Sequence, residues 1–343
     1  MKNRIRKLFK QNETYIFLIL VALSFLIQVR SGQFYTSNNI IDITSAMIVP
    51  GLFAIAEFIV ILSGGIDVSF PALASLSAYA TTKYLLEIGY EGSVLTAILM
   101  ALVIGAVLGM VNGFFVGYMN FPAMIVTLGT SSIFKGIMQG TLESKQLAVI
   151  PNGMKEFGKS AILTVTSSQS GLSSKLPSAF LVLVIVALIT FIILRYTMFG
   201  RGIYAIGGNE SAAYNAGFKV KQTKFLLYVF SGMIASVAGI IRVCMMQQCH
   251  PTNMLGMEMN IIAGVVLGGT AMDGGRGTLT GCFLGTLLIV LVENSMILIG
   301  VPVVWKNVFV GMLIVVGTAV SAYQSYRRSI SHGNRKTTEE VAL

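Results

Sequence analysis

Apolar residues occur along this chain in runs of about 20, the length that an α-helix needs to cross the hydrocarbon core of a bilayer. Short polar intervals separate the runs. The pattern predicts an all-α fold, a polytopic transmembrane helical bundle of about ten spans in a single domain over residues 1–343. The eighth run is short and contains paired glycines, so we expect a broken or re-entrant helix there. The expected spans are residues 15–29, 40–62, 66–86, 94–118, 122–141, 178–196, 225–246, 258–272, 278–299 and 302–323.

One polar, charged interval carries helix signals of its own. It covers residues 201–224, RGIYAIGGNESAAYNAGFKVKQTK, between two strongly apolar runs. Asn209 can cap a helix, Glu210 suits its first turn, and Gly217 can end it. We therefore expect a short helix at the membrane surface, flanked by basic residues. The residues expected to form or bound it are Gly207, Gly208, Asn209, Glu210, Ala212, Ala213 and Gly217.

Composition agrees with a membrane protein, since 55% of the residues are hydrophobic, 11% are charged and the mean hydropathy is +0.79. The net charge of +10 would suggest a nucleic-acid partner in a soluble domain. Here the basic residues lie mostly at the ends of predicted spans, so we expect the lipid bilayer and no nucleic acid as a partner. The three cysteines have no Cys-x-x-Cys spacing, and neither a disulfide framework nor a metal site is expected.

The distribution of Lys and Arg predicts the orientation. With an inside N-terminus and an even number of spans, 15 of the 24 basic residues fall on the cytoplasmic side. Both termini are then cytoplasmic, as residues 1–14 and 324–343, together with a cytoplasmic loop at 199–224. Residues 142–177 become an extracytoplasmic loop. The basic N-terminus and the first apolar run resemble a signal peptide, but no small-x-small cleavage site follows, so we expect an uncleaved first span.

A nucleotide-binding pattern occurs inside the predicted outer loop. Residues 153–160, GMKEFGKS, match G-x-x-x-x-G-K-[ST] letter for letter. A phosphate-binding loop needs a buried strand before it and a helix after it, whose N-terminal amides face the phosphates. The residues that follow, 161–168, favour an extended or irregular segment. We therefore interpret the match as fortuitous.

Small residues recur at one-turn spacing in two predicted spans. Such ladders let helix backbones approach closely, and we interpret them mainly as helix-packing surfaces, with a flexible gating contact as the alternative. The ladders are Gly105, Gly109, Gly113 and Gly117 in the fourth span, and Gly277, Gly281 and Gly285 entering the ninth.

Polar residues inside predicted spans should face the interior of the bundle, because an ionisable group in hydrocarbon is costly unless it is paired or hydrated. These residues are Glu57, Asn112, Lys135, Glu293 and Asn294. Either of the two glutamates could form a structural ion pair with Lys135, and the same residues could instead line a solute pathway. The sequence leaves both interpretations open.

A weak internal repeat links the two halves of the chain. The segments LSGGID at 62–67 and LGGTAMD at 267–273 each end an apolar run with paired glycines followed by an acid. Transporters commonly contain such repeats, with the solute between the halves, and we expect the acids to lie at an inner gate. The candidate pathway or gate residues are Gly64, Gly65, Asp67, Ser69, Asn112, Thr127, Lys135, Glu258, Gly268, Gly269, Asp273, Glu293 and Asn294.

Over most of its length the chain resembles the membrane permease of bacterial ABC importers of the ribose/xylose/galactose class. Five segments carry the resemblance, in the order in which the family has them. They are ILSGGIDVS at 61–69, MIVTLGTSSIFKGI at 124–137, GRGIYAIGGNESAAYNAGFKV at 200–220, YVFSGMIASVAGI at 228–240 and IIAGVVLGGTAMDGGRGTLTGCFLGTLL at 261–288.

The resemblance implies a multi-pass protein of the bacterial cytoplasmic membrane, assembled as a dimer with a second permease copy or a paralogue. It also implies two cytoplasmic ATP-binding subunits, which use ATP and Mg, and an extracytoplasmic solute-binding protein. The chain itself would bind no cofactor. The helix at 207–217 would be the one that inserts into the ATPase. Related permeases carry pentoses, hexoses, a furanosyl signalling molecule or nucleosides, and the choice stays open. The chain departs from the family's pattern at Phe70, Pro71, Met124, Ser211 and Tyr214.

Two other classes of function are alternatives to this interpretation. A self-sufficient secondary transporter could use Glu57 or Glu293 as a proton site. A membrane enzyme is disfavoured, because the chain has only two histidines, His250 and His332, and no Ser/His or metal-ligand pattern.

Overall fold

One long helix, α12 (Val220–Met246), runs through the centre of the bundle, with α4, α5 and α6 packed around it. The computed structural model describes residues 12–142, 145–166, 173–306, 308–312 and 315. Half of the tenth predicted span, together with residues 1–11 and 324–343 of the terminal segments, lies outside these residues. The central position of α12 follows from its sequence, in which Gly, Ala and Ser recur among the buried positions and allow neighbouring helices to approach closely.

The chain forms α2 (Asn12–Ser31), α3 (Ser37–Ala46), α4 (Ile48–Leu62), α5 (Phe70–Glu87), α6 (Val94–Gly113) with the π-helical turn η1 (Phe114–Tyr118), and α7 (Ala123–Gly140). Then follow α8 (Asn152–Lys159), β1 (Ala161–Thr166), β2 (Ser173–Pro177), α9 (Ala179–Tyr196), α10 (Met198–Gly208) and α11 (Glu210–Asn215). After α12 come α13 (Glu258–Leu267), α14 (Leu279–Ser295) and the short η2 (Val303–Trp305). The fold is therefore mostly helical, as predicted.

Fewer helices than expected are long and apolar enough to cross a membrane by themselves. Among the described residues there are four, namely α2, α6 with η1, α9 and α12, or five if α3 and α4 form one bent span. The second predicted span is broken by a bend of 41° between α3 and α4. Pro50 lies in the first turn of α4 and cannot donate the backbone hydrogen bond that would continue α3. The eighth span is short, as expected, because α13 has only 10 residues.

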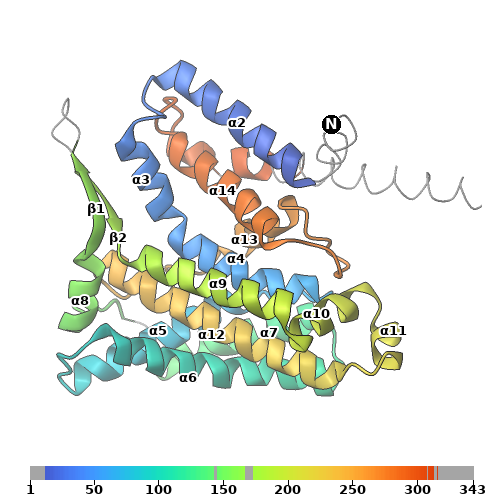
Figure 1. Ribbon diagram of the computed structural model, residues 1–343. Coiled ribbons are helices and arrows are strands. Elements are labelled where there is room, and N and C mark those ends of the chain that lie inside the picture. Colours follow the sequence, from blue (N-terminus) through green and yellow to red (C-terminus); the bar gives the residue numbers. More distant parts are fainter. Residues whose placement is uncertain (1–11, 143–144, 167–172, 307, 313–314, 316–343) are drawn as a thin grey trace, which may run out of the picture.

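The predicted outer loop contains the one departure from an all-helical chain within the described residues. There α8 is followed by an antiparallel hairpin of β1 and β2. The extended character expected for residues 161–168 is confirmed for the part that the structure describes. The hairpin and α8 lie at one end of the bundle, and α10 and α11 lie at the other (Figure 1).

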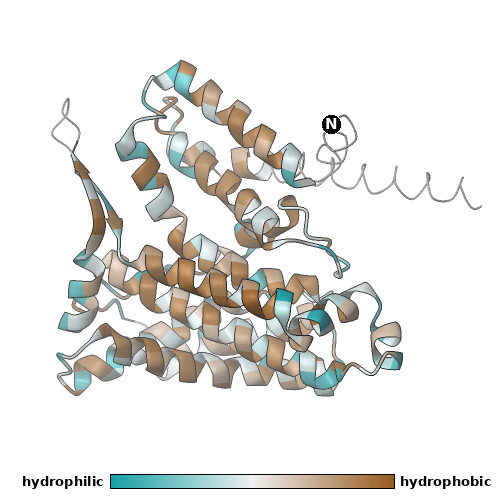
Figure 2. Cartoon of the chain, viewed as in Figure 1, coloured by the Kyte–Doolittle hydropathy of each residue, from teal (hydrophilic) through white to brown (hydrophobic). Residues whose placement is uncertain are grey.

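The ladder in α6 is a helix-packing surface, as predicted. A methyl group on Gly109 would lie 2.5 Å from the carbonyl oxygen of Tyr228, and one on Gly117 would lie 2.9 Å from that of Lys221. The opposite side of α6 is apolar and exposed, with Val103 at 64% exposure. Figure 2 shows that apolar residues also cover the outer surfaces of α2 and α9. A lipid-facing surface on these helices agrees with a multi-pass membrane protein.

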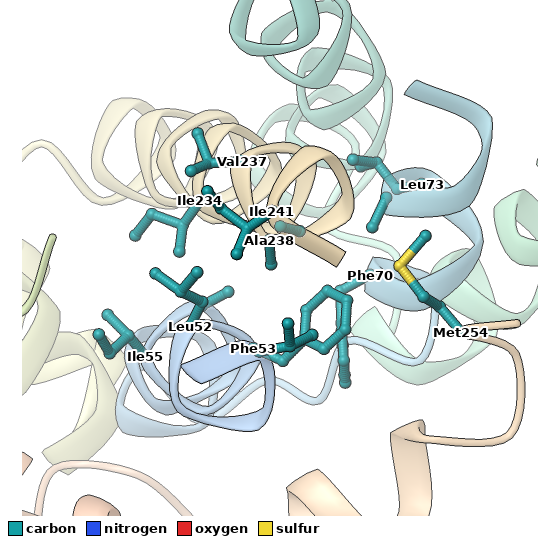
Figure 3. Close-up of a cluster of buried hydrophobic side chains, with 14 of the residues drawn as sticks. Leu52, Phe53, Ile55, Phe70, Leu73, Ile234, Val237, Ala238, Ile241 and Met254 are labelled. Atoms are coloured by element: carbon teal, nitrogen blue, oxygen red, sulfur yellow. The ribbon is translucent and has the colours of Figure 1, made fainter. Parts of the chain in front are cut away.

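The core lies between α4, α5 and α12, where Leu52, Phe53, Phe70 and Ile241 meet (Figure 3). The rings of Phe53 and Phe70 are 5.2 Å apart, and Phe70 is only 1% exposed. Pro71 is in the first turn of α5, where a proline fits without loss of a hydrogen bond. Two of the departures from the family's pattern therefore have a structural explanation, because they fill the core and begin a helix.

Candidate functional site: a glycine junction and a buried polar cluster

Two helices from different halves of the chain end in the same way. α4 ends at Leu62 and α13 at Leu267, and the second residue after each is a glycine with positive φ, 85° at Gly64 and 91° at Gly269. Glycine adopts this conformation without a steric penalty, which lets the next amide bond back into the last turn. The two segments that the sequence pairs as a weak repeat therefore share a backbone geometry at these helix ends. The returning bonds run from Gly65 to Val60 and from Thr270 to Val265.

The two breaks contact each other and the end of α10. The amide of Gly275 donates a hydrogen bond of 2.8 Å to the carbonyl of Leu62. A methyl group on Gly207, in the last turn of α10, would overlap that same carbonyl oxygen. Backbone therefore touches backbone at a point where three parts of the chain converge. We call Leu62, Gly64, Gly207, Gly274 and Gly275 the glycine junction.

Beside this junction, the loop between α4 and α5 is held by a network of buried side chains. The Asp67 amide donates to Glu57 Oε1 at 3.2 Å, and the Ser69 hydroxyl donates to Asp67 Oδ1 at 2.6 Å. Asn112 donates to that hydroxyl oxygen at 2.8 Å and accepts from Thr130 at 2.7 Å. The network connects α4, α6 and α7. Together with Thr127, whose hydroxyl oxygen accepts from the Val68 amide at 3.1 Å, these residues form the polar cluster.

The polar cluster is closed to the surface. Its six side chains are between 0% and 5% exposed. Asp67 and Ser69, which the sequence places at an inner gate, lie beneath the surface in this structure and bond to protein groups, and their role in a gate stays a prediction. Glu57 Oε2 and the hydroxyl of Tyr228 are buried without a hydrogen-bond partner. Neither acid has a basic partner among the described residues, so both depend on the hydrogen bonds of the cluster for their burial.

Near the junction, the predicted surface helix is α11, and it begins and ends where the sequence indicated. Asn209 Oδ1 accepts from the Ala212 amide at 2.9 Å, and Gly217 has a φ of 86°. Ala213 is buried against Ile206 and Val220. Gly207 and Gly208 belong to α10, an additional helix that the sequence analysis did not separate from the rest of the interval. α11 thus stands directly after the helix that ends in the glycine junction.

One ion pair fixes the start of α11, while other residues of the helix stay exposed to solvent. Glu210 pairs with Lys224 at 2.7 Å, which ties the start of α11 to α12. Ala212 is exposed, and Tyr214 is 72% exposed. An exposed aromatic beside small side chains is suited to a protein contact.

The remaining pathway candidates are not brought together. Glu293 pairs with Lys306 at 3.2 Å and accepts from Asn260 at 3.0 Å, far along α14 from its start near the junction. Lys135 is half-buried, and among the described residues it forms no ion pair with either glutamate. The others have local contacts. Glu258 accepts a hydrogen bond from the Gly256 amide, and Asn294 donates one to the Val290 carbonyl within α14. Gly268 packs against Gly281, and Asp273 is exposed beside the junction.

The nucleotide-binding pattern does not form a phosphate loop. Its residues build the helix α8, and the strand follows the pattern when it should precede it. The two glycines serve close packing, because a methyl group on Gly153 or Gly158 would overlap the carbonyl oxygen of Gly92 or Cys244. The interpretation of the match as fortuitous agrees with this geometry.

Several residues of these sites carry no distinctive signal in the sequence. Thr130 and Tyr228 are examples, since a single hydroxyl in an apolar helix forms no pattern. Gly274 and Gly275 form a glycine pair in the run DGGRG, and this pair is the sequence signal that could have identified them. In the structure both have positive φ, 86° and 71°.

Comparison with known proteins assigns this architecture to a family. A family described as branched-chain amino acid transport system / permease component matches residues 39–317. The chain is 32% identical to the ribose import permease of Bacillus subtilis over 90% of this chain and 92% of the relative. It is 30% identical to the D-allose transport system permease of Escherichia coli K12 over 89% of each. It is 29% identical to the autoinducer 2 import permease of Klebsiella pneumoniae over 98% of this chain and 96% of that protein.

Proposed function

Because the chain belongs to the family of branched-chain amino acid transport system permease components, we propose that it is the membrane permease subunit of an ABC importer that carries a sugar. The relatives named above import ribose, allose and autoinducer 2. The similarity extends over nearly the whole of each protein. It therefore supports a shared role in import, and not merely one domain in common. The solute class is therefore a monosaccharide or a related small hydroxylated molecule.

The proposed assembly contains two permeases, either two copies of this chain or this chain with a paralogue. Two cytoplasmic ATP-binding subunits use ATP and Mg to drive it, and a solute-binding protein delivers the sugar from outside. The end of the bundle with α10 and α11 faces the cytoplasm, and the end with α8 and the hairpin faces outward. The basic residues around α11 support this orientation, since Arg201, Lys219 and Lys221 are exposed there.

The contact that best supports this function is the one between α10 and the two helix breaks. An ATPase docked on the exposed side of α11 would move α10, which α11 follows directly. Gly207 at the end of α10 touches Leu62, so the displacement would reach the loop that the polar cluster holds. Backbones in direct contact transmit a displacement because no flexible side chain between them can absorb it. The contact of α10 with the two breaks would thus couple ATP hydrolysis to a movement inside the membrane.

A proton-coupled secondary transporter is the competing proposal. Its candidate Glu293 is already neutralised by Lys306, and Glu57 lies in a closed cluster. The test is reconstitution of the chain in proteoliposomes with its ATP-binding subunit and binding protein, using labelled D-ribose as the first probe and D-allose as the second. Uptake should require ATP and continue when a protonophore removes the proton gradient. Uptake by the chain alone, or its loss with the protonophore, would contradict the proposal.

A further inference from the structure

A second polar region lies at the opposite end of the bundle from the glycine junction. A pocket of about 500 Å³ opens there between the end of α3, the end of α12, the loop before α13, and the last turns of α14. Its volume lies within the range of about 300–1,000 Å³ that is usual for small-molecule sites. None of the residues of the glycine junction or the polar cluster lines it. The proposed function gives this pocket no role.

The polar groups of the pocket form two sets of contacts. Arg242 Nε donates to Asn253 Oδ1 at 2.9 Å, and Asn260 donates to Glu293 Oε1 at 3.0 Å. Lys306 lies 3.2 Å from the same carboxylate oxygen. These five side chains all line the pocket, while Ile261 and Ile289 provide an apolar wall.

Charge pairing in the pocket leaves specific groups free. Glu293 is neutralised by Lys306, so the pocket offers no unpaired carboxylate to an ammonium group. Arg242 has no carboxylate partner among the described residues, and its terminal nitrogens stay available as donors. Asn260 Oδ1 and Glu293 Oε2 remain as acceptors. Neighbouring hydroxyls on a sugar ring each donate and accept, and their C–H faces suit an apolar wall, so the arrangement matches a neutral polyhydroxylated solute.

We propose that this pocket is a low-affinity binding site for an uncharged sugar on the extracytoplasmic side of the permease, with Arg242, Asn260 and Glu293 contacting the hydroxyls. The inference rests on the proposed function, because that function supplies the orientation and the solute class. It locates in this chain a site that receives the solute before the membrane interior opens.

The test measures protection of a cysteine from chemical labelling. Ala46 lines the pocket, is half-buried and makes none of the polar contacts, so Ala46→Cys places a small reporter there. The native cysteines Cys244, Cys249 and Cys282 are buried and contribute little background. Lys159→Cys, on the exposed surface of α8 at the same end, is the matched control. A charged, membrane-impermeant maleimide is added to intact cells that express each variant.

Both cysteines should be labelled, and D-ribose or D-allose should slow only the labelling of Ala46→Cys. At about 50 mM sugar and a Kd of about 5 mM, the labelling rate should fall about tenfold. L-Leucine, a zwitterion, should give no protection. Arg242→Met in the Ala46→Cys background should keep the unprotected labelling rate and lose the protection.

Several outcomes would overturn the inference. They are an unlabelled Ala46→Cys, equal slowing of both cysteines by sugar, no slowing by either sugar, or protection by L-leucine. The proposed function fails by a different observation, namely uptake that does not depend on ATP or on the partner subunit. Protection from labelling measures binding and not uptake, so the two failures can be told apart.

Discussion

Gly274 faces Gly64 so closely that a methyl group added to Gly274 would lie 2.6 Å from the backbone nitrogen of Gly64. Gly274 follows α13 and Gly64 follows α4, so each half of the chain contributes one glycine to the contact. A methyl group on Gly64 would lie 3.2 Å from the carbonyl oxygen of Asp273, and both glycines have positive φ, so a side chain is disfavoured at either position. The junction is therefore well suited to tests by substitution.

Gly207→Ala should uncouple the transporter. The added methyl group would overlap the Leu62 carbonyl oxygen, so α10 must shift away from the breaks. We expect ATP-driven sugar uptake to fall at least about tenfold, equivalent to about 1.4 kcal/mol in the rate-limiting step. ATPase recruitment in a pull-down should stay normal.

Gly208→Ala is the matched control, because a methyl group there meets nothing within 4 Å. Its uptake should be close to that of the unmodified protein. Equal loss of uptake in both variants would show that the contact of Gly207 with Leu62 is not what matters.

Ala212→Arg should prevent docking of the ATP-binding subunit. Ala212 is exposed on α11, and a long charged side chain there would hold the two surfaces apart. The measurement is co-purification of the ATP-binding subunit together with uptake. Ala161→Arg makes the same change on the exposed hairpin at the opposite end and should leave both unaffected. Normal recruitment by Ala212→Arg would remove α11 from the interface.

Lys159→Ala should leave ATP hydrolysis by the assembled complex unchanged. Lys159 is the lysine of the nucleotide-like pattern, but it is an exposed residue in the last turn of α8, at the end of the bundle that we place outside. The ATPase rate of the purified complex checks this. A tenfold loss would contradict both the fortuitous match and the orientation.

Gly109→Ala should destabilise the protein. Its methyl group would lie 2.5 Å from the Tyr228 carbonyl oxygen and 3.0 Å from the Cα of Val229, so α6 must move away from α12. Overpacking of this kind costs about 1–3 kcal/mol in the free energy of unfolding. Thermal unfolding of the protein in nanodiscs should show a lower midpoint.

Gly129→Ala is the control for that measurement. Gly129 lies within α7, and a methyl group there meets nothing within 4 Å. Alanine favours helix over glycine by about 1 kcal/mol, so the midpoint should stay constant or rise. A midpoint lowered equally in both variants would exclude close packing as the cause.

The sequence predicted those features that depend on local chemistry. The cap at Asn209, the end at Gly217 and the ladder from Gly105 to Gly117 each follow from residues within a few turns of one another. The break near Met47 was not predicted, because residues 46–56 form one apolar run through Pro50. The pairing of Glu293 with Lys306 and the meeting of Gly207 with Leu62 join segments that are distant in the chain. No pattern along one stretch encodes such contacts, which arise only when the helices assemble.

The ladder on α6 also limits where a solute can travel. From Gly105 to Gly117 the backbone of α6 rests on that of α12, and a methyl group added at any of the four glycines would meet an α12 backbone oxygen at 2.9 Å or less. A seam this tight along the length of a span admits neither water nor a sugar ring. We therefore expect the two helices to move as one unit if they move during transport. The passage for the solute therefore has to open along a different side of the bundle.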